Sequence, residues 1–102
     1  MERGLFNITS ATTTSLITKG ERAGNIKSIN IANCHATNLV YVSLYLDDDT
    51  NQTYFFKKNL LYPGERIFLN NGISFDNISL GLKITTETVV TSQAIDTNVI
   101  IK

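Results

Sequence analysis

The sequence contains very little of the chemistry that disulfides, metal sites and active sites require. Its 102 residues include one cysteine, Cys34, and one histidine, His35. A single cysteine excludes an internal disulfide, and zinc sites in proteins use three or four Cys, His or carboxylate ligands. Neighbouring residues of a strand point to opposite faces, which is a poor arrangement for a nucleophile and its base. We therefore expect a small buried Cys34 beside a loop-edge histidine, and no enzyme activity, metal or cofactor.

Net charge and long apolar runs are also missing. Nine lysines and arginines balance nine aspartates and glutamates, so the formal net charge is zero, and overall charge gives no attraction to nucleic acid. No apolar run approaches the ~20 residues of a membrane-spanning helix. The first four residues are not followed by the apolar stretch of a secretory signal. We therefore expect synthesis in a cytoplasm, with neither nucleic acid nor a membrane as partner.

The residues that are abundant favour β-structure. Thr, Ile, Val, Tyr and Phe suit a pleated, half-buried surface, and Asn, Asp and Gly interrupt them at roughly the 8–12-residue spacing of sandwiches and barrels. We predict an all-β fold, a compact antiparallel β-sandwich of jelly-roll or immunoglobulin-like type with about seven to nine strands; a closed β-barrel is the alternative. The expected strands are 5–9, 15–18, 26–33, 39–46, 53–57, 66–69, 73–75, 80–86 and 98–101.

Two parts of the chain are harder to assign. Residues 1–24 are expected to form an N-terminal arm or peripheral strands, and 25–102 the sandwich core. The Ser/Thr-rich stretch 10–15 suits either an arm that orders on binding or a plain loop. Residues 88–94 suit a strand or an irregular connection. Tyr62-Pro63-Gly64-Glu65 is the strongest turn signal, because proline presets φ and glycine accepts a positive φ.

More apolar surface is present than one sandwich core needs. In the strand 39–46 the even positions are all aliphatic, and the odd positions, which should face solvent, include Tyr41 and Tyr45. Tyr54 and Phe56 add aromatic rings to the following strand. Aromatic residues are enriched at protein interfaces, so we predict that Tyr41, Tyr45, Tyr54 and Phe56 contact another subunit. The alternative is that loops of the same chain cover these faces.

The order of several short motifs resembles small β-sandwich structural proteins of tailed bacteriophages. The motifs are Ile29-Asn30-Ile31-Ala32-Asn33, Val42-Ser43-Leu44-Tyr45-Leu46, Tyr54-Phe55-Phe56, Tyr62-Pro63-Gly64-Glu65 and Leu82-Lys83-Ile84. The resemblance covers roughly residues 25–102. It implies a non-enzymatic virion protein at the head–tail neck, or a capsid decoration or cement protein. Implied partners are capsid, portal, neck or tail subunits and further copies of the chain, after synthesis in the host bacterial cytoplasm.

A second function is a carbohydrate- or receptor-binding module of a tail fibre. Tyr41, Tyr45 and the acidic run Asp47-Asp48-Asp49 could form a sugar platform with calcium, which prefers oxygen ligands. The run lacks the spacing of an EF-hand loop, and Asp and Asn are favoured in turns. A solvated hairpin tip is therefore the simpler interpretation, and the absence of tryptophan also weakens the sugar platform.

Overall fold

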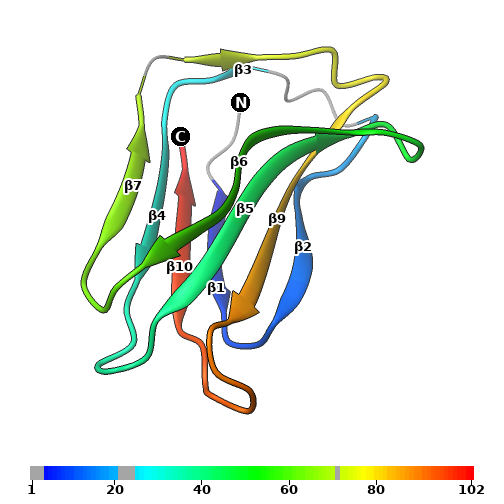
Figure 1. Cartoon of the computed structure of the whole chain (residues 1–102). Coiled ribbons are helices and arrows are strands. Elements are labelled where there is room, and N and C mark those ends of the chain that lie inside the picture. Colours follow the sequence, from blue (N-terminus) through cyan, green and yellow to red (C-terminus); the bar gives the residue numbers. More distant parts are fainter. Residues whose placement is uncertain (1–3, 21–24, 71) are drawn as a thin grey trace.

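The computed structural model describes residues 4–20, 25–70 and 72–102, and it places ten strands and no helix in them (Figure 1). The strands are β1 (Gly4–Ile8), β2 (Thr12–Ile17), β3 (Asn25–Ile26), β4 (Ile29–Asn33), β5 (Val40–Asp47), β6 (Gln52–Leu61), β7 (Arg66–Leu69), β8 (Ile73–Ser74), β9 (Gly81–Thr88) and β10 (Thr97–Ile101). Within this described part, no helix has the length and apolar character needed to cross a membrane.

The strands pair as one long hairpin that is rolled up. β1 pairs with β10, β2 with β9, β3 with β8, β4 with β7 and β5 with β6, all antiparallel. The pairings of β10 with β4 and of β5 with β9 join them into two four-stranded sheets, sheet A (β1-β10-β4-β7) and sheet B (β2-β9-β5-β6). This is jelly-roll topology. The predicted antiparallel sandwich is confirmed, and the closed-barrel alternative is wrong because the two sheets remain separate.

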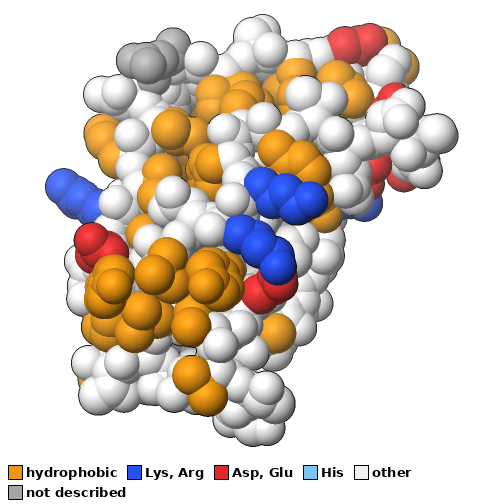
Figure 2. Space-filling view, viewed as in Figure 1, with side chains coloured by type: hydrophobic (Ala, Val, Ile, Leu, Met, Phe, Trp, Pro, Cys, Tyr) orange, Lys and Arg blue, Asp and Glu red, His pale blue; other side chains and the backbone are white. Residues whose placement is uncertain are grey.

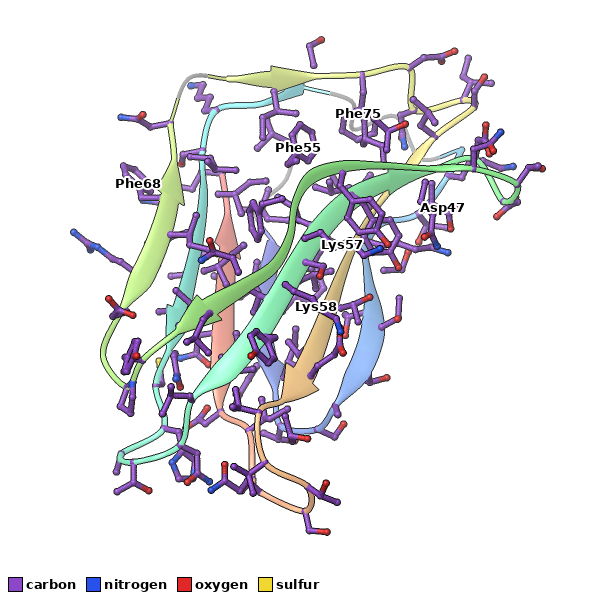
Figure 3. All side chains as sticks on the ribbon, in the orientation of Figure 1. Asp47, Phe55, Lys57, Lys58, Phe68 and Phe75 are labelled. Carbon is purple, nitrogen blue, oxygen red and sulfur yellow. The ribbon has the colours of Figure 1, made fainter. Side chains whose placement is uncertain are left out.

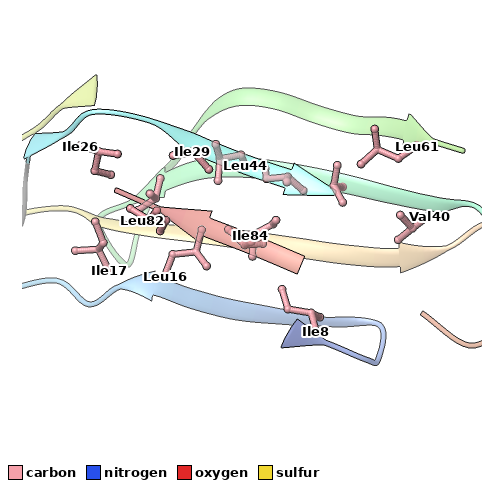
Figure 4. Close-up of a cluster of buried hydrophobic side chains, with 14 of the residues drawn as sticks. Ile8, Leu16, Ile17, Ile26, Ile29, Val40, Leu44, Leu61, Leu82 and Ile84 are labelled. Carbon is pink, nitrogen blue, oxygen red and sulfur yellow. The ribbon is translucent and has the colours of Figure 1, made fainter. Parts of the chain in front are cut away.

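The core lies between the two sheets and follows the alternation of apolar residues. β4 and β10 bury every second side chain, as expected for strands with one face on a core. The apolar side chains with 0–1% exposure are Ile29, Ile31, Val40, Val42, Leu44, Leu82, Ile84, Val99 and Ile101. Figure 4 shows side chains from both sheets meeting in this layer.

The N-terminal segment forms edge strands. Thr12–Ile17 is β2 and pairs with β9, where Thr13 Oγ1 lies 2.9 Å from Thr85 Oγ1. Residues 12–15 of the Ser/Thr-rich stretch thus lie in a strand and form neither an arm nor a plain loop, while 1–3 and 21–24 lie outside the described residues.

The same segment also contributes to the core. Ile8, Leu16 and Ile17 are buried in it, so the core is not confined to the predicted range 25–102. The edge strands of both sheets are thus integral parts of one sandwich.

β6 is longer than the predicted strand 53–57, because it begins at Gln52 and continues through Lys58 to Leu61. Register shifts opposite β5 and a positive φ of 52° at Lys58 mark β-bulges. The Lys58 N–H donates to Ser43 Oγ at 2.9 Å, which satisfies a backbone group displaced from the ladder. Lys57 and Lys58 are therefore bulge residues at a sheet edge.

Two other predicted strand boundaries also change. The stretch 26–33 is not one strand, because the chain leaves β3 at Ile26 and begins β4 at Ile29. Between β9 and β10 the residues 89–96 form turns and irregular structure, so the irregular alternative for 88–94 is the one found beyond Thr88.

Candidate interaction surface

Tyr45 points outward from sheet B, as the strand alternation predicts, and yet it is only 4% exposed. Its ring lies 4.9 Å from that of Tyr54, which is directly opposite on β6, and its hydroxyl lies 3.2 Å from Thr85 Oγ1. The Lys57 Nζ lies 5.1 Å from the centre of the Tyr54 ring, within range for a cation–π contact. The chain thus covers Tyr45 with its own side chains, and Tyr54 remains 37% exposed.

Phe56 lies on the opposite face of the same strand from this tyrosine pair. It is opposite Leu44 in the ladder, is half-buried and packs against the core. The contact role predicted for Tyr41, Tyr45, Tyr54 and Phe56 stays a prediction. Most of the surface of Tyr45 and Phe56 is buried within the chain itself.

Tyr41 belongs to a second group at the other end of the same face. It is opposite Leu60 in the β5–β6 ladder. Leu39 directly precedes Val40 and Tyr62 directly follows Leu61, and Val40 and Leu61 are the next pair of the same ladder. We call Leu39, Tyr41, Leu60 and Tyr62 the apolar patch.

The apolar patch is open to solvent. Tyr62 is 54% exposed, and the other three side chains are half-buried. Figure 2 shows hydrophobic side chains gathered over the end of β6 and the start of β5, with basic and acidic side chains beside them. Sequence reasoning found Tyr41 and missed Leu60 and Tyr62, because their position beside it depends on the register across two bulges.

Charged groups of both signs border the apolar patch. Lys58 Nζ lies 3.7 Å from Glu87 Oε2, and Glu87 is the β9 neighbour of Tyr41. On the other side, Glu65 Oε1 accepts a hydrogen bond from the Tyr62 N–H at 2.7 Å. An apolar centre with a mixed polar border is the usual composition of a protein interface.

The outer face of sheet A carries a separate row of four side chains, of which three are apolar. Leu5, Ile100, Asn30 and Phe68 are consecutive neighbours across its four strands. Leu5 is 73% exposed and Phe68 53%. Figure 3 shows Phe68 projecting from β7 at the side of the molecule. Sheet A therefore also presents apolar side chains to solvent.

The acidic run Asp47-Asp48-Asp49 lies at the hairpin tip between β5 and β6 (Figure 3), where its carboxylates have partners within the chain. Asp47 Oδ2 accepts a hydrogen bond from Lys83 Nζ at 2.8 Å, and Asp49 pairs with Lys19. The bond from Lys83, together with one from the Asp49 N–H, lowers the pKa of the Asp47 carboxyl. The carboxylate of Asp47 is thus ionised and already paired.

Asp48 has a structural role in the same turn. Its Oδ1 accepts hydrogen bonds from the Asn51 N–H at 2.6 Å and the Thr50 N–H at 2.9 Å, which together lower its pKa. In the described residues no group of three or more Cys, His, Asp or Glu side chains could hold a metal ion. The three carboxylates that the sugar-platform alternative assigns to calcium are used in turn bonds and ion pairs.

Cys34 is exposed, so the predicted burial of this side chain is wrong. It follows β4 directly, where the chain turns away from the core, and its Sγ lies 3.9 Å from the carbonyl of Ala32. His35 Nδ1 accepts hydrogen bonds from the N–H groups of Thr37 and Asn38, at 3.1 and 3.0 Å. The imidazole therefore stabilises its own loop.

Comparisons with known proteins find few matches. No family model and no curated protein matches the chain. A chain in the structure of infectious bursal disease virus, Gx strain, aligns with a TM-score of 0.46 and 13% identity over 98% of this chain. A chain from the Gt strain of that virus aligns with a TM-score of 0.35 and 16% identity over 95%. This chain spans 32% and 26% of their lengths.

Proposed function

We propose that this chain is a non-enzymatic virion structural protein of a tailed bacteriophage, which binds neighbouring subunits at the head–tail neck or on the capsid surface. The observation that carries the binding role is the apolar patch at one end of β5 and β6, where Tyr62 is 54% exposed and Leu39, Tyr41 and Leu60 are half-buried. The virion setting is supported by the resemblance of the strand and turn motifs. Jelly rolls occur in viral capsid domains and in lectin domains. This support for a virion role is an analogy of fold.

Burial of the apolar patch against a partner would supply the binding energy. Full burial of one large apolar side chain is worth roughly 1.5–3 kcal/mol, and Tyr62 has more than half of its surface available. A stable interface covers about 800 Å² per partner, which is more than four side chains provide. The patch is therefore the centre of a contact that extends over its charged border.

The charged groups that border the apolar patch then affect which partner is bound. Lys58, Glu87 and Glu65 place both signs of charge within one interface edge. Surface ion pairs contribute little to affinity, but mismatched charges on a wrong partner are unfavourable. We expect the patch to determine the strength of binding and the border to determine its orientation.

The test is incorporation into particles. The gene is expressed with its neighbouring genes, particles are purified on a density gradient, and the chain is quantified by mass spectrometry. Tyr62→Ser and Leu60→Ser should reduce incorporation at least tenfold. Phe68→Ser is the matched control, because Phe68 is an aromatic side chain of nearly equal exposure on the other sheet.

Each outcome is decisive. Stoichiometric incorporation that depends on Tyr62 and is unaffected at Phe68 supports the proposal. Absence of the wild-type chain from particles refutes the virion role. Incorporation that survives both patch substitutions refutes the assignment of the contact to sheet B.

A further inference from the structure

We infer that β1 is a strand-pairing edge that accepts β1 of a second copy of this chain, antiparallel and about a two-fold axis. This inference rests on the proposed structural role and names one of the partners. It starts from the four edge strands of the sandwich, which are β1 and β7 in sheet A and β2 and β6 in sheet B. Exposed edges invite strand addition, so proteins usually protect them with charges, bulges or shortness.

Three of the four edges carry such protection. β6 has Lys57, Lys58 and two register shifts against β5. β2 has a register shift between Ser15 and Ile17. β7 has only four residues and begins with Arg66. Each of these features disfavours continuous pairing with another strand.

β1 has neither a charged residue nor a bulge, and with five residues it is one residue longer than β7. Gly4–Ile8 contains no charged residue and no proline, and it pairs with β10 in unbroken register from Gly4 opposite Ile101 to Ile8 opposite Thr97. Within the described residues no strand pairs with its other side. An extended strand with unpaired backbone groups on one side can bind a further strand through main-chain hydrogen bonds.

The surface beside β1 favours β1 of a second copy as the strand that pairs with its free side. Leu5 projects with 73% exposure, and it lines an open hollow of about 330 Å³ together with Asn7, Asn98 and Ile100. In an antiparallel pair centred on Phe6, Leu5 of each copy falls opposite Asn7 of the other, at the border of that hollow. One strand thus provides both contacting side chains, Leu5 and Asn7, as an isologous two-fold contact requires.

The absence of charge on β1 and the continuation of sheet A across both copies agree with this two-fold pairing. The chain has no net charge and β1 has no charged side chain, so two copies approach without repulsion along this edge. Pairing would also make sheet A continuous across both copies, and it would extend the outer row of Leu5 and Ile100 into the partner.

The experiment measures the mass of the full-length chain by light scattering and sedimentation over a wide concentration range. The wild type should form a dimer. Leu5→Lys and Asn7→Lys place a charge on exposed, outward positions of β1, and they should remove the dimer. Thr13→Lys, on the edge strand β2, and Phe68→Lys, on the same outer face at the far edge, are the matched controls and should leave it intact.

Hydrogen exchange provides a readout that needs no substitution. Amide exchange in Gly4–Ile8 should slow as the wild-type concentration rises, with no change in Thr12–Ile17. Wild-type chain that stays monomeric, a dimer lost equally in Thr13→Lys or Phe68→Lys, or a dimer without protection of β1 would each overturn the inference. Such a result leaves the proposed function standing if particle incorporation still depends on Tyr62, so the two failures are distinguishable.

Discussion

Replacing Asn33 by alanine should destabilise the fold by about 3 kcal/mol. Asn33 is 1% exposed at the end of β4. Its Nδ2 donates to the carbonyls of Asn38 at 2.9 Å and Leu61 at 3.0 Å, and its Oδ1 accepts from the His35 N–H at 3.1 Å. One side chain thus joins the loop after β4 to the end of β6.

The magnitude follows from these three bonds. A typical hydrogen bond contributes about 1 kcal/mol net, and a buried group left without a partner costs about 1–3 kcal/mol. Asn33→Ala removes three bonds, one of them to the Leu61 carbonyl in a buried site. For a domain of about 100 residues, a loss of about 3 kcal/mol lowers Tm by on the order of 15 °C.

Asn33→Asp separates hydrogen bonding from loss of volume. It keeps the shape of the side chain, but at neutral pH it sets a carboxylate against the carbonyls of Asn38 and Leu61. We expect it to be at least as destabilising as Asn33→Ala at pH 7 and to recover in part at low pH, where the protonated acid can donate one bond.

Urea denaturation followed by circular dichroism measures these changes. Asn59→Ala, an exposed asparagine of β6, is the control and should stay within about 0.5 kcal/mol of the wild type. A loss below about 1 kcal/mol for Asn33→Ala, or a loss of equal size at Asn59, would refute the assignment of these bonds as a structural tie.

Two further predictions concern stability. Leu44→Ala, at a site with no exposure, should lower the free energy of unfolding by about 2–5 kcal/mol. Ile78→Ala, at an 82% exposed site, should change it by less than about 0.5 kcal/mol. Equal losses of the two variants in urea denaturation would contradict the assigned core. The folded-state pKa of Asp47 is lowered, so its contribution to stability is present above pH about 4, the unfolded value, and is lost as the pH falls through the folded pKa. Asp47→Asn should therefore flatten the acid limb of stability against pH, and an unchanged limb would contradict the ion pair.

Local sequence patterns were enough to predict most of the strands and their inner faces. Alternation along 39–46 predicts which side chains of β5 enter the core, and Val40, Val42 and Leu44 are buried in it as predicted, whereas Leu46 is half-buried. The turn at Tyr62-Pro63-Gly64-Glu65 was equally readable, since Gly64 has the positive φ, 85°, that the pattern requires. These features depend on residues close together in the chain.

The candidate surface was only partly predictable, because it depends on register. Tyr41 faces Leu60 because the bulges of β6 shift the pairing that the β5–β6 hairpin alone would set. Tyr45, whose contact with another subunit stays a prediction, lies against Tyr54 and beside the β9 residue Thr85. A pattern along one strand cannot show what a neighbouring strand places above it.

The sequence by itself determined that this chain is a β-sandwich with two-faced strands, since the alternation of apolar and polar residues is a local property with a period of two. Only the tertiary structure decided that the first strand pairs with the last, which surfaces stay exposed and which edge is left unprotected. Those outcomes come from contacts between residues up to the whole chain length apart, where burial and register, rather than local preference, set the free energy.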